Sequence, residues 1–477
     1  MTTLRFGTSG WRAVLGEDFT VANVRLVCRA IADHVRDITG AQARDVIVGY
    51  DTRFLSERFA RVAADALAEG GLRPLLCAAA TPTPAVAFHV IRRGLAGAVT
   101  ITASHNPPEY NGVKFTPAWG GPALPATTRA IEARIDALAR GGSGLAAAAA
   151  PNAAHGPVPP RLVDAQAEYL EGLTQLVDFD AIRSRRLRVV VDPLYGAARG
   201  YLDQLLGRGG ARMTVIHDFR DPYFGGRRPD PDEQGLRDLS TAVSEGDAEL
   251  GLATDGDADR FGVVDEDGTF VAPNLVLGLL LDYLATTRAW RSGVGVARSV
   301  ATTHLVDAVA AAHGLVVHET PVGFKFIGAR IADGSAVFGG EESAGLAITG
   351  HIPDKDGVLA CLLVAEMVAR SGKGLREQVE ALFRRVGWYH TARVDVTITP
   401  AVRERLAAIL ADPPAALAGV GVREVNRLDG CKLLLADGAW LLLRPSGTEP
   451  LVRCYAEAGA PDRLVAVLAD ARRLLGA

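Results

Sequence analysis

The chain has 477 residues and a net charge of −4, with 48% hydrophobic and 22% charged residues. At roughly 100–200 residues per domain, this length predicts three or four globular domains. The mildly acidic balance argues against nucleic acid as the main partner, because proteins that bind it usually present a basic surface. An anionic substrate is still possible, since a few clustered Arg and Lys can make one positive cleft.

Strand-like and helix-like patterns alternate over most of the chain, which favours parallel α/β layers. In chain order we predict strand 46–50, helix 56–69, strand 75–78, helix 84–93, strand 98–102, strand 187–191, helix 197–206, strand 213–217, strand 250–254, strand 261–264, strand 294–297, helix 303–312, strand 315–318, strand 336–339 and helix 357–370. The segment 141–160 is rich in Gly, Ala and Pro and is interpreted as a linker.

The last part of the chain, from about Gly387, follows another pattern. It contains an alternating strand over 393–398, a helix over 402–410, a hairpin over 431–443 and an amphipathic helix over 461–475. We therefore predict the α/β class: three similar α/β domains with mixed sheets plus a C-terminal α+β domain, with the active site in the central cleft.

The cysteines and the apolar segments bear on the compartment. The five cysteines are scattered and form no C-x-x-C pair, so neither a disulfide framework nor a zinc site is expected. The residues up to Trp11 show no apolar signal region, and the apolar stretch Leu275–Ala285 is too short for a membrane span. We expect a cytoplasmic protein without a membrane partner.

A hydroxyl follows the predicted strand 98–102, in the segment Thr102–Pro107. Small residues and a following proline expose Ser104 at a strand end, where α/β sheets carry their chemistry. As a nucleophile, Ser104 would need a base or an electrophile nearby. The alternative is an ordinary turn in which Ser104 bonds local backbone.

Three carboxylates at alternate positions follow the predicted strand 250–254. In a loop, Asp255, Asp257 and Asp259 can converge, and a hard divalent cation such as Mg²⁺ or Ca²⁺ would relieve their repulsion. With Glu266 they also match EF-hand positions 1, 3, 5 and 12. We discount that alternative because Arg260 stands where an EF-hand needs glycine and the flanks are predicted strands, not helices.

Two further loops carry polar groups. Glu341, Glu342 and Ser343 on the glycine-rich segment 339–345 can hydrogen-bond vicinal sugar hydroxyls, although a helix start would also suit them. The segment Arg444–Pro450 follows a strand-like run and combines Arg, two hydroxyls and Gly, as in a phosphate cradle. Alone, it would also fit an ordinary turn.

Taken together and in this order, the four loops resemble those of the α-D-phosphohexomutase superfamily, which contains phosphoglucomutases and phosphomannomutases. The N-terminal segment Phe6–Arg12 and the segment Thr320–Lys325 also resemble the family pattern. Ala13 and Ala344 stand where many relatives have Gly. One loop falls in each predicted domain: the serine loop in 1–150, the metal-binding loop in 160–265, the sugar-binding loop in 266–385 and the phosphate-binding loop in 386–477.

The resemblance implies a role for each matching residue. Ser104 would carry the phosphoryl group and, with the three aspartates, would complete a Mg²⁺ site. The catalytic set would be Ser104, His105, Lys114 and Arg12. The substrate-binding set would be Arg260, Lys325, Glu341, Ser343, Arg444, Ser446, Gly447, Thr448 and Arg453. Either Lys114 or His105 could be the general base, and the sequence does not choose between them.

The implied reaction is that of a sugar-phosphate mutase, an isomerase. Phospho-Ser104 would donate to a hexose monophosphate, and a hexose 1,6-bisphosphate would form, turn end for end and rephosphorylate Ser104. The Glu-Glu-Ser loop and the segment His351–Gly357 look most like phosphoglucomutases. The alternatives are a phosphomannomutase, a dual glucose/mannose mutase, or an inactive sugar-phosphate sensor. A monomer or a homodimer is expected.

Overall fold

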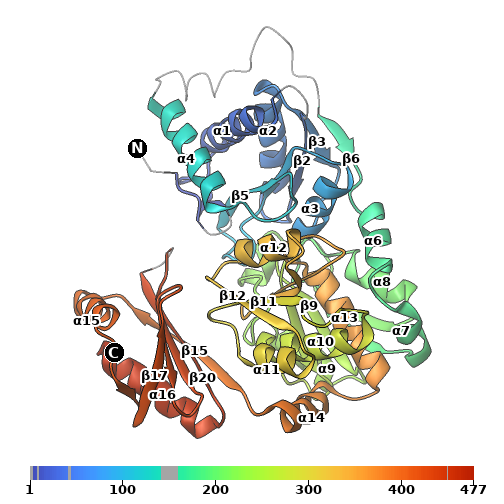
Figure 1. Cartoon of the computed structure of the whole chain (residues 1–477). Helices are drawn as coiled ribbons and strands as arrows, with labels where there is room; N and C mark the ends of the chain where they lie inside the picture. Colours follow the sequence, from blue (N-terminus) through green and yellow to red (C-terminus); the bar gives the residue numbers. More distant parts are fainter. Residues whose placement is uncertain (1–3, 8–9, 41–43, 141–159, 448–449, 477) are drawn as a thin grey trace. The chain divides into compact units, whose positions relative to one another are not determined.

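The computed structural model describes residues 4–7, 10–40, 44–140, 160–447 and 450–476 (Figure 1). The chain forms two compact units. The first comprises Met1–Pro273, Gly328–Gly334 and Ser343–Leu375, and the second comprises Asn274–Ile327, Ser335–Glu342 and Arg376–Ala477. Most of the predicted linker, residues 141–159, lies outside the described residues.

The first sheet of the first unit is mixed. Its order is β1 (Trp11–Val14), β5 (Tyr110–Pro117), β4 (Gly97–Ile101), β2 (Asp45–Tyr50), β3 (Arg73–Cys77) and β6 (Arg161–Val163). The strands β4, β2, β3 and β6 run parallel to one another, whereas β5 is antiparallel to both β4 and β1.

Helices cover both faces of this sheet, which explains why β2 is apolar at consecutive positions. Val46 and Val48 pack in one cluster with α1 (Val21–Thr39), α2 (Ser56–Glu69) and α4 (Pro125–Arg140), while Ile47 packs with α3 (Thr83–Arg92) on the other face (Figure 1).

The second sheet has the order β10 (Phe261–Asp265), β9 (Leu250–Thr254), β7 (Arg188–Asp192) and β8 (Arg212–Val215). The strands β9, β7 and β8 are parallel, and β9 and β10 form an antiparallel hairpin. Its helices are α6 (Ala167–Thr174), α7 (Phe179–Arg185), α8 (Leu202–Arg208), α9 (Arg237–Ser244) and α13 (Gly357–Ser371). β14 (Gly345–Ile348) also belongs to the first unit.

One predicted helix of this region begins later than expected. The pattern predicts helix 197–206, but α8 begins at Leu202. Leu194 and Tyr195 adopt positive φ angles, and the amide of Ala197 bonds the carbonyl of Gly256. The residues before Leu202 therefore form turns that contact the loop 255–260, here called the acidic loop.

The third sheet centres on β11 (Gly295–Ser299), which pairs in parallel with β12 (Val316–Thr320) and β13 (Ala336–Glu341). The helices in this part of the sequence are α10 (Pro273–Thr287), α11 (Leu305–Ala312), α12 (Phe324–Ala332) and α14 (Leu375–Val386). Within the second unit, Gly278 of α10 lets Leu305 of α11 approach closely, because a β-carbon there would lie 2.4 Å from Leu305 Cδ2.

The last sheet is antiparallel throughout. Its order is β15 (His390–Thr397), β20 (Leu451–Ala458), β19 (Trp440–Pro445), β18 (Cys431–Leu435), β17 (Val420–Asn426) and β16 (Ala416–Leu417), and its helices are α15 (Pro400–Ala411) and α16 (Pro461–Leu475).

Both faces of β19 are buried, so this sheet packs against other elements of the second unit. Leu441 and Leu443 join the core that includes α16, while Trp440 and Leu442 pack with Val300. The predicted class is confirmed: three mixed α/β sheets are followed by a C-terminal antiparallel-sheet domain. None of the helices in the described part of the chain combines the length and the apolarity that a membrane crossing needs.

Candidate active site

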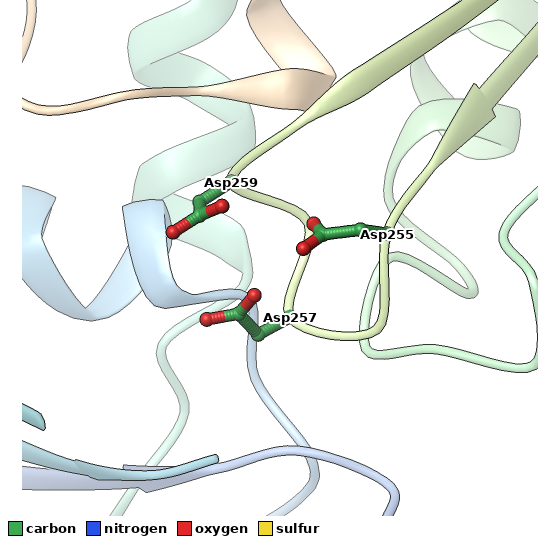
Figure 2. A group of neighbouring side chains, drawn as sticks. All are labelled: Asp255, Asp257 and Asp259. Carbon is green, nitrogen blue, oxygen red and sulfur yellow. The ribbon is translucent and has the colours of Figure 1, made fainter. Parts of the chain in front are cut away.

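The three aspartates of the acidic loop converge. The loop joins β9 to β10, and Asp255, Asp257 and Asp259 each offer a carboxylate oxygen within 4.8 Å of the others (Figure 2). The hairpin register pairs Thr254 with Phe261, so six residues must turn between them. Gly256 and Ala258, the latter with a left-handed φ of 62°, provide that turn. All three aspartates are buried.

Lysine side chains from other segments of the first unit face this triad. Lys114 Nζ on β5 lies 2.6 Å from Asp257 Oδ2 and 2.9 Å from Asp259 Oδ2, and Lys355 Nζ lies 3.4 Å from Asp259 Oδ2. Burial opposes the charge on Lys114, but Asp257 and Asp259 outweigh it and raise the pKa of the ammonium.

The three carboxyl groups are not equivalent. Burial, together with the charges of Asp257 and Asp259, raises the pKa of Asp255 well above its ordinary value. Burial also acts against ionisation of Asp257 and Asp259, yet the ion pairs with Lys114 leave both of their pKa values lowered. Asp255 is thus the least readily ionised of the three.

The triad fits a divalent cation. The buried oxygens Asp257 Oδ1 and Asp259 Oδ1 accept no hydrogen bond from any described residue. Buried acceptors without a donor are costly, and oxygen-only ligation suits Mg²⁺. The buried triad is therefore consistent with a Mg²⁺ site. The EF-hand alternative is excluded because both flanks, β9 and β10, are strands.

Ser104 lies three residues beyond the end of β4, in the loop that leads to β5. Its side chain is buried, its φ is 52°, and its Oγ donates to Asp255 Oδ2 at 2.7 Å. Arg12, on β1, reaches the same loop, where its guanidinium donates to Asn106 Oδ1 at 2.6 Å. The structure thus brings Arg12, Ser104, Lys114 and the triad into one region of the first unit.

His105 meets a carboxylate that the sequence analysis missed. Its Nδ1 lies 3.1 Å from Asp230 Oδ2 and 3.1 Å from a guanidinium nitrogen of Arg228. Arg260 Nη1 lies 3.6 Å from Asp230 Oδ1. Burial and then the charge of Arg260 lower the pKa of His105 to about 4, although Asp230 acts in the opposite direction. The only signal for Asp230 in the sequence is its place between two prolines.

The sugar-loop candidates begin at Glu341, the last residue of β13. Glu341 Oε1 accepts from the amide of Gly323 at 2.7 Å, so this buried carboxylate also fixes the turn before α12. Ser343 is half-buried in the turn that precedes β14. The alternative of a helix start is wrong, because the segment is a strand, a turn and a second strand.

The phosphate-loop candidates lie in the second unit. Arg444 on β19 and Arg453 on β20 are direct partners across the antiparallel pair. Like charges directly opposite each other destabilise a strand pair. Arg444 Nε bonds Asp429 Oδ2 at 2.9 Å, and the amide of Val322 bonds the same oxygen at 3.0 Å. Asp429 was also missed, because nothing in the sequence links it to Arg444.

The remaining candidates of this unit are Ser446, Gly447, Thr448 and Lys325. The amide of Ser446 bonds the carbonyl of Leu451 at 2.8 Å, and Gly447 is exposed, whereas Thr448 lies outside the described residues. Lys325 on α12 is half-buried. Burial lowers the pKa of Lys325. The charge of Glu341 opposes this effect, and the charge of Arg444 adds to it.

Sequence comparison covers both units. Four models of one family match in order: the phosphoglucomutase/phosphomannomutase α/β/α domain I over residues 3–141, domain II over 167–268, domain III over 272–386 and the C-terminal domain over 401–475. A phosphoglucomutase from Komagataeibacter xylinus is 31% identical, over 95% of this chain and 87% of that protein. The chain belongs to the phosphoglucomutase/phosphomannomutase family.

Other phosphohexomutases match at a similar level. A phosphoglucomutase/phosphomannomutase from Thermococcus kodakarensis is 30% identical over 96% of this chain and 95% of its own. A candidate phosphoglucosamine mutase from Thermococcus gammatolerans is 31% identical over 98% of both chains. The crystal structure of a candidate phosphomannomutase from Thermus thermophilus has a TM-score of 0.84 and 33% identity, with full coverage of both chains.

Proposed function

We propose that this phosphohexomutase interconverts glucose 1-phosphate and glucose 6-phosphate through phosphorylated Ser104 and glucose 1,6-bisphosphate. The observation that carries the proposal is the Ser104 hydroxyl, which lies 2.7 Å from Asp255 Oδ2 beside two further buried carboxylates. A nucleophile against an acidic triad suits phosphoryl transfer, in which positioning and charge stabilisation account for most of the catalysis.

The triad is the proposed metal site. We propose that Mg²⁺ would be held by Asp255, Asp257 and Asp259, and that an oxygen of phosphorylated Ser104 would complete the set of ligands. Bound there, the ion would offset the negative charge of the phosphoryl group. The fit rests on the two unsatisfied buried oxygens of Asp257 and Asp259.

The chain's own cations supply the rest of the positive charge near Ser104. Arg12, Arg260 and Lys114 come from three different segments of the first unit, and they would orient the transferring phosphoryl group. Lys114 and His105 are the two groups proposed to exchange a proton with the sugar hydroxyl. Asp230 contacts His105 and would set its orientation.

The sugar loop and the phosphate loop are proposed to bind the sugar hydroxyls and the second phosphate. We assign the sugar hydroxyls to Glu341 and Ser343, with Lys325 nearby. The phosphate that does not react is assigned to Arg444, Ser446, Gly447, Thr448 and Arg453. The support is chemical, because Arg444 and Arg453 are like charges in register across one strand pair.

The choice of glucose rests on the Glu-Glu-Ser loop, on the segment His351–Gly357, and on the name of the Komagataeibacter relative. The test is a side-by-side assay of glucose 1-phosphate, mannose 1-phosphate and glucosamine 1-phosphate, with Mg²⁺ and a trace of the matching bisphosphate. We expect the highest kcat/KM for glucose 1-phosphate. An equal or higher value for mannose would favour the dual or mannose enzyme, and a higher value for glucosamine would reject both.

Phosphorylation of Ser104 separates a mutase from an inactive sugar-phosphate sensor. Intact-mass measurement should find one phosphate on the wild-type protein after incubation with glucose 1,6-bisphosphate, and none on Ser104→Ala. The variant should fold and lose turnover. If Ser104→Ala keeps a near-wild-type rate, the phosphoserine mechanism is wrong.

A further inference from the structure

We propose that Arg53, paired with Asp51, is a positioning residue that fixes the backbone of Ser104 in the conformation from which its hydroxyl reacts. This inference rests on the proposed role of Ser104 as nucleophile. Arg53 is completely buried, so it acts through the serine loop and not by touching substrate.

The guanidinium of Arg53 binds the serine loop at four carbonyl groups. One terminal nitrogen donates to the carbonyls of Ser104 and Asn106, at 2.6 Å each. The other donates to the carbonyls of Pro107 at 2.7 Å and Tyr110 at 3.0 Å. Hydrogen bonds from an ionised donor are stronger than neutral ones, and the planar fork of arginine fixes their directions.

Asp51 closes a ring of hydrogen bonds around Ser104. Its Oδ2 accepts from Arg53 Nε at 3.1 Å and from Thr102 Oγ1 at 2.7 Å. Thr102 Oγ1 in turn accepts from the amide of Ser104 at 2.8 Å. Both the amide and the carbonyl of Ser104 are thereby connected to the same ion pair.

The fold explains why these residues meet. β2 and β4 are parallel neighbours in which Tyr50 pairs with Ile101, so both chains leave the sheet at the same edge. Asp51 and Arg53 follow β2, and Thr102 and Ser104 follow β4. The pair can therefore hold the serine loop from the adjacent strand end.

Ser104 needs such a support. Its φ of 52° is left-handed, a conformation that is unfavourable for a residue with a β-carbon and persists only where the surroundings enforce it. In this conformation the hydroxyl reaches Asp255. Without the Arg53 bonds the carbonyls of Ser104 and Asn106 would lose a charged donor, and Ser104 would relax to a common φ, moving its hydroxyl away from the triad.

The test compares Arg53→Lys and Arg53→Met with Arg298→Met. Arg298 is also a buried arginine; it is ion-paired with Asp307 and Glu319 and has no role in the proposed site. We expect both Arg53 variants to lose roughly 100-fold in kcat, with KM within about threefold, because a displacement near 1 Å has that effect. Arg298→Met should lose stability and keep its kcat per folded molecule.

Single-turnover phosphorylation of Ser104 by glucose 1,6-bisphosphate, followed by intact mass, should slow by the same factor in the Arg53 variants. A merely structural role would not slow this step in the folded protein. A kcat and phosphorylation rate within about threefold of wild type in folded Arg53→Met, or an equal loss in Arg298→Met, would overturn the proposal.

A second pair of variants, at Thr102, tests the same proposal if the Arg53 variants do not fold. Thr102→Val removes the acceptor for the Ser104 amide at nearly constant volume, whereas Thr102→Ser keeps it. We expect phosphorylation of Ser104 to slow roughly 10-fold or more in Thr102→Val and to return to within about threefold of wild type in Thr102→Ser. Equal rates in the two variants would overturn the proposal. An active Ser104→Ala would instead reject the phosphoserine mechanism itself.

Discussion

The Ser104 hydroxyl donates to Asp255 Oδ2 across 2.7 Å, although the two residues are 151 positions apart along the chain. Both residues lie beyond the carboxyl ends of strands, Ser104 after β4 and Asp255 after β9, in two different sheets. Open α/β sheets carry their ligands at this edge. The contact places a hydroxyl against Asp255, the carboxyl group of the buried triad that ionises least readily.

We expect Asp255→Asn to stabilise the metal-free protein and to weaken Mg²⁺ binding. Burial and two neighbouring carboxylates raise the pKa of Asp255, so its ionised form disfavours the folded state at neutral pH. Removing that charge should raise the midpoint of thermal unfolding in EDTA by about 2 °C. Calorimetric titration should show at least a roughly tenfold loss of Mg²⁺ affinity, by analogy with losses caused by changes around metal ligands.

Asp192→Asn is the matched control for this change. Asp192 is equally buried, but its carboxylate faces His217 at 3.0 Å and accepts from the amide of Leu194. This variant should lower the unfolding midpoint and retain wild-type Mg²⁺ affinity. Wild-type Mg²⁺ affinity in Asp255→Asn would show that the triad is not the metal site.

Arg444→Ala should raise KM for the sugar phosphate by roughly tenfold or more, with kcat within about threefold. A hydrogen bond to a charged group contributes about 1.5–3 kcal/mol, and a phosphate that does not react is bound about equally in the ground and transition states. Asp429→Asn should raise KM less, because it loosens the hold on Arg444 Nε without removing the arginine. Steady-state kinetics over a range of substrate concentrations measures both effects.

Arg473→Ala controls for the loss of positive charge from the same domain. Its side chain is 71% exposed and pairs with Asp470 on the same helix, so KM should not change. An Arg444→Ala enzyme with wild-type KM, or with kcat alone reduced, would contradict the assignment of Arg444 to the phosphate that does not react.

Much of the fold could be predicted because its segments have one dominant pattern. The ranges of helix 56–69, strand 250–254 and helix 461–475 were predicted as the structure has them. β20 was not predicted, because it is an interior strand of its sheet and is buried on both faces from Cys454 to Ala458, so alternation is lost. The late start of α8 depends on a backbone bond to Gly256, which no local pattern reveals.

In the candidate site, too, local sequence patterns indicate some residues, whereas others depend on contacts that only the fold creates. The motif residues could be proposed because their types and spacing are informative, and they stay predictions, as do the domain limits and the residue roles. Asp230, Asp429 and Arg53 were missed because each acts on a partner brought near by the fold. Ala344 shows how structure explains a sequence difference. Its φ of 66° is left-handed, a conformation that glycine adopts at no steric cost.

A buried lysine in the second unit, Lys432, is expected to make the stability of the fold depend on pH. Lys432 Nζ bonds the carbonyl of Val300 at 2.8 Å and His304 Nε2 at 2.9 Å, and it lies 4.1 Å from the centre of the Trp440 ring. Burial lowers its pKa to about 8. Its charged surroundings also include Arg298, which adds to this effect, and Glu319, Glu457 and Asp307, which oppose it. His304, whose own pKa burial lowers to about 2, accepts as a neutral ring.

Because the pKa of Lys432 in the folded protein is about 8 and its ordinary value is 10.5, the unfolded chain binds more protons between these two pH values. The folded state should therefore gain stability as the pH rises through this window, and the penalty should be complete below pH 8. Lys432→Met lacks this titration. The free energy of unfolding of wild type minus that of Lys432→Met, measured by denaturant titration, should rise by up to about 3 kcal/mol from pH 8 to 10.5. A difference that stays constant or falls over this range would show that Lys432 keeps an ordinary pKa in the folded protein.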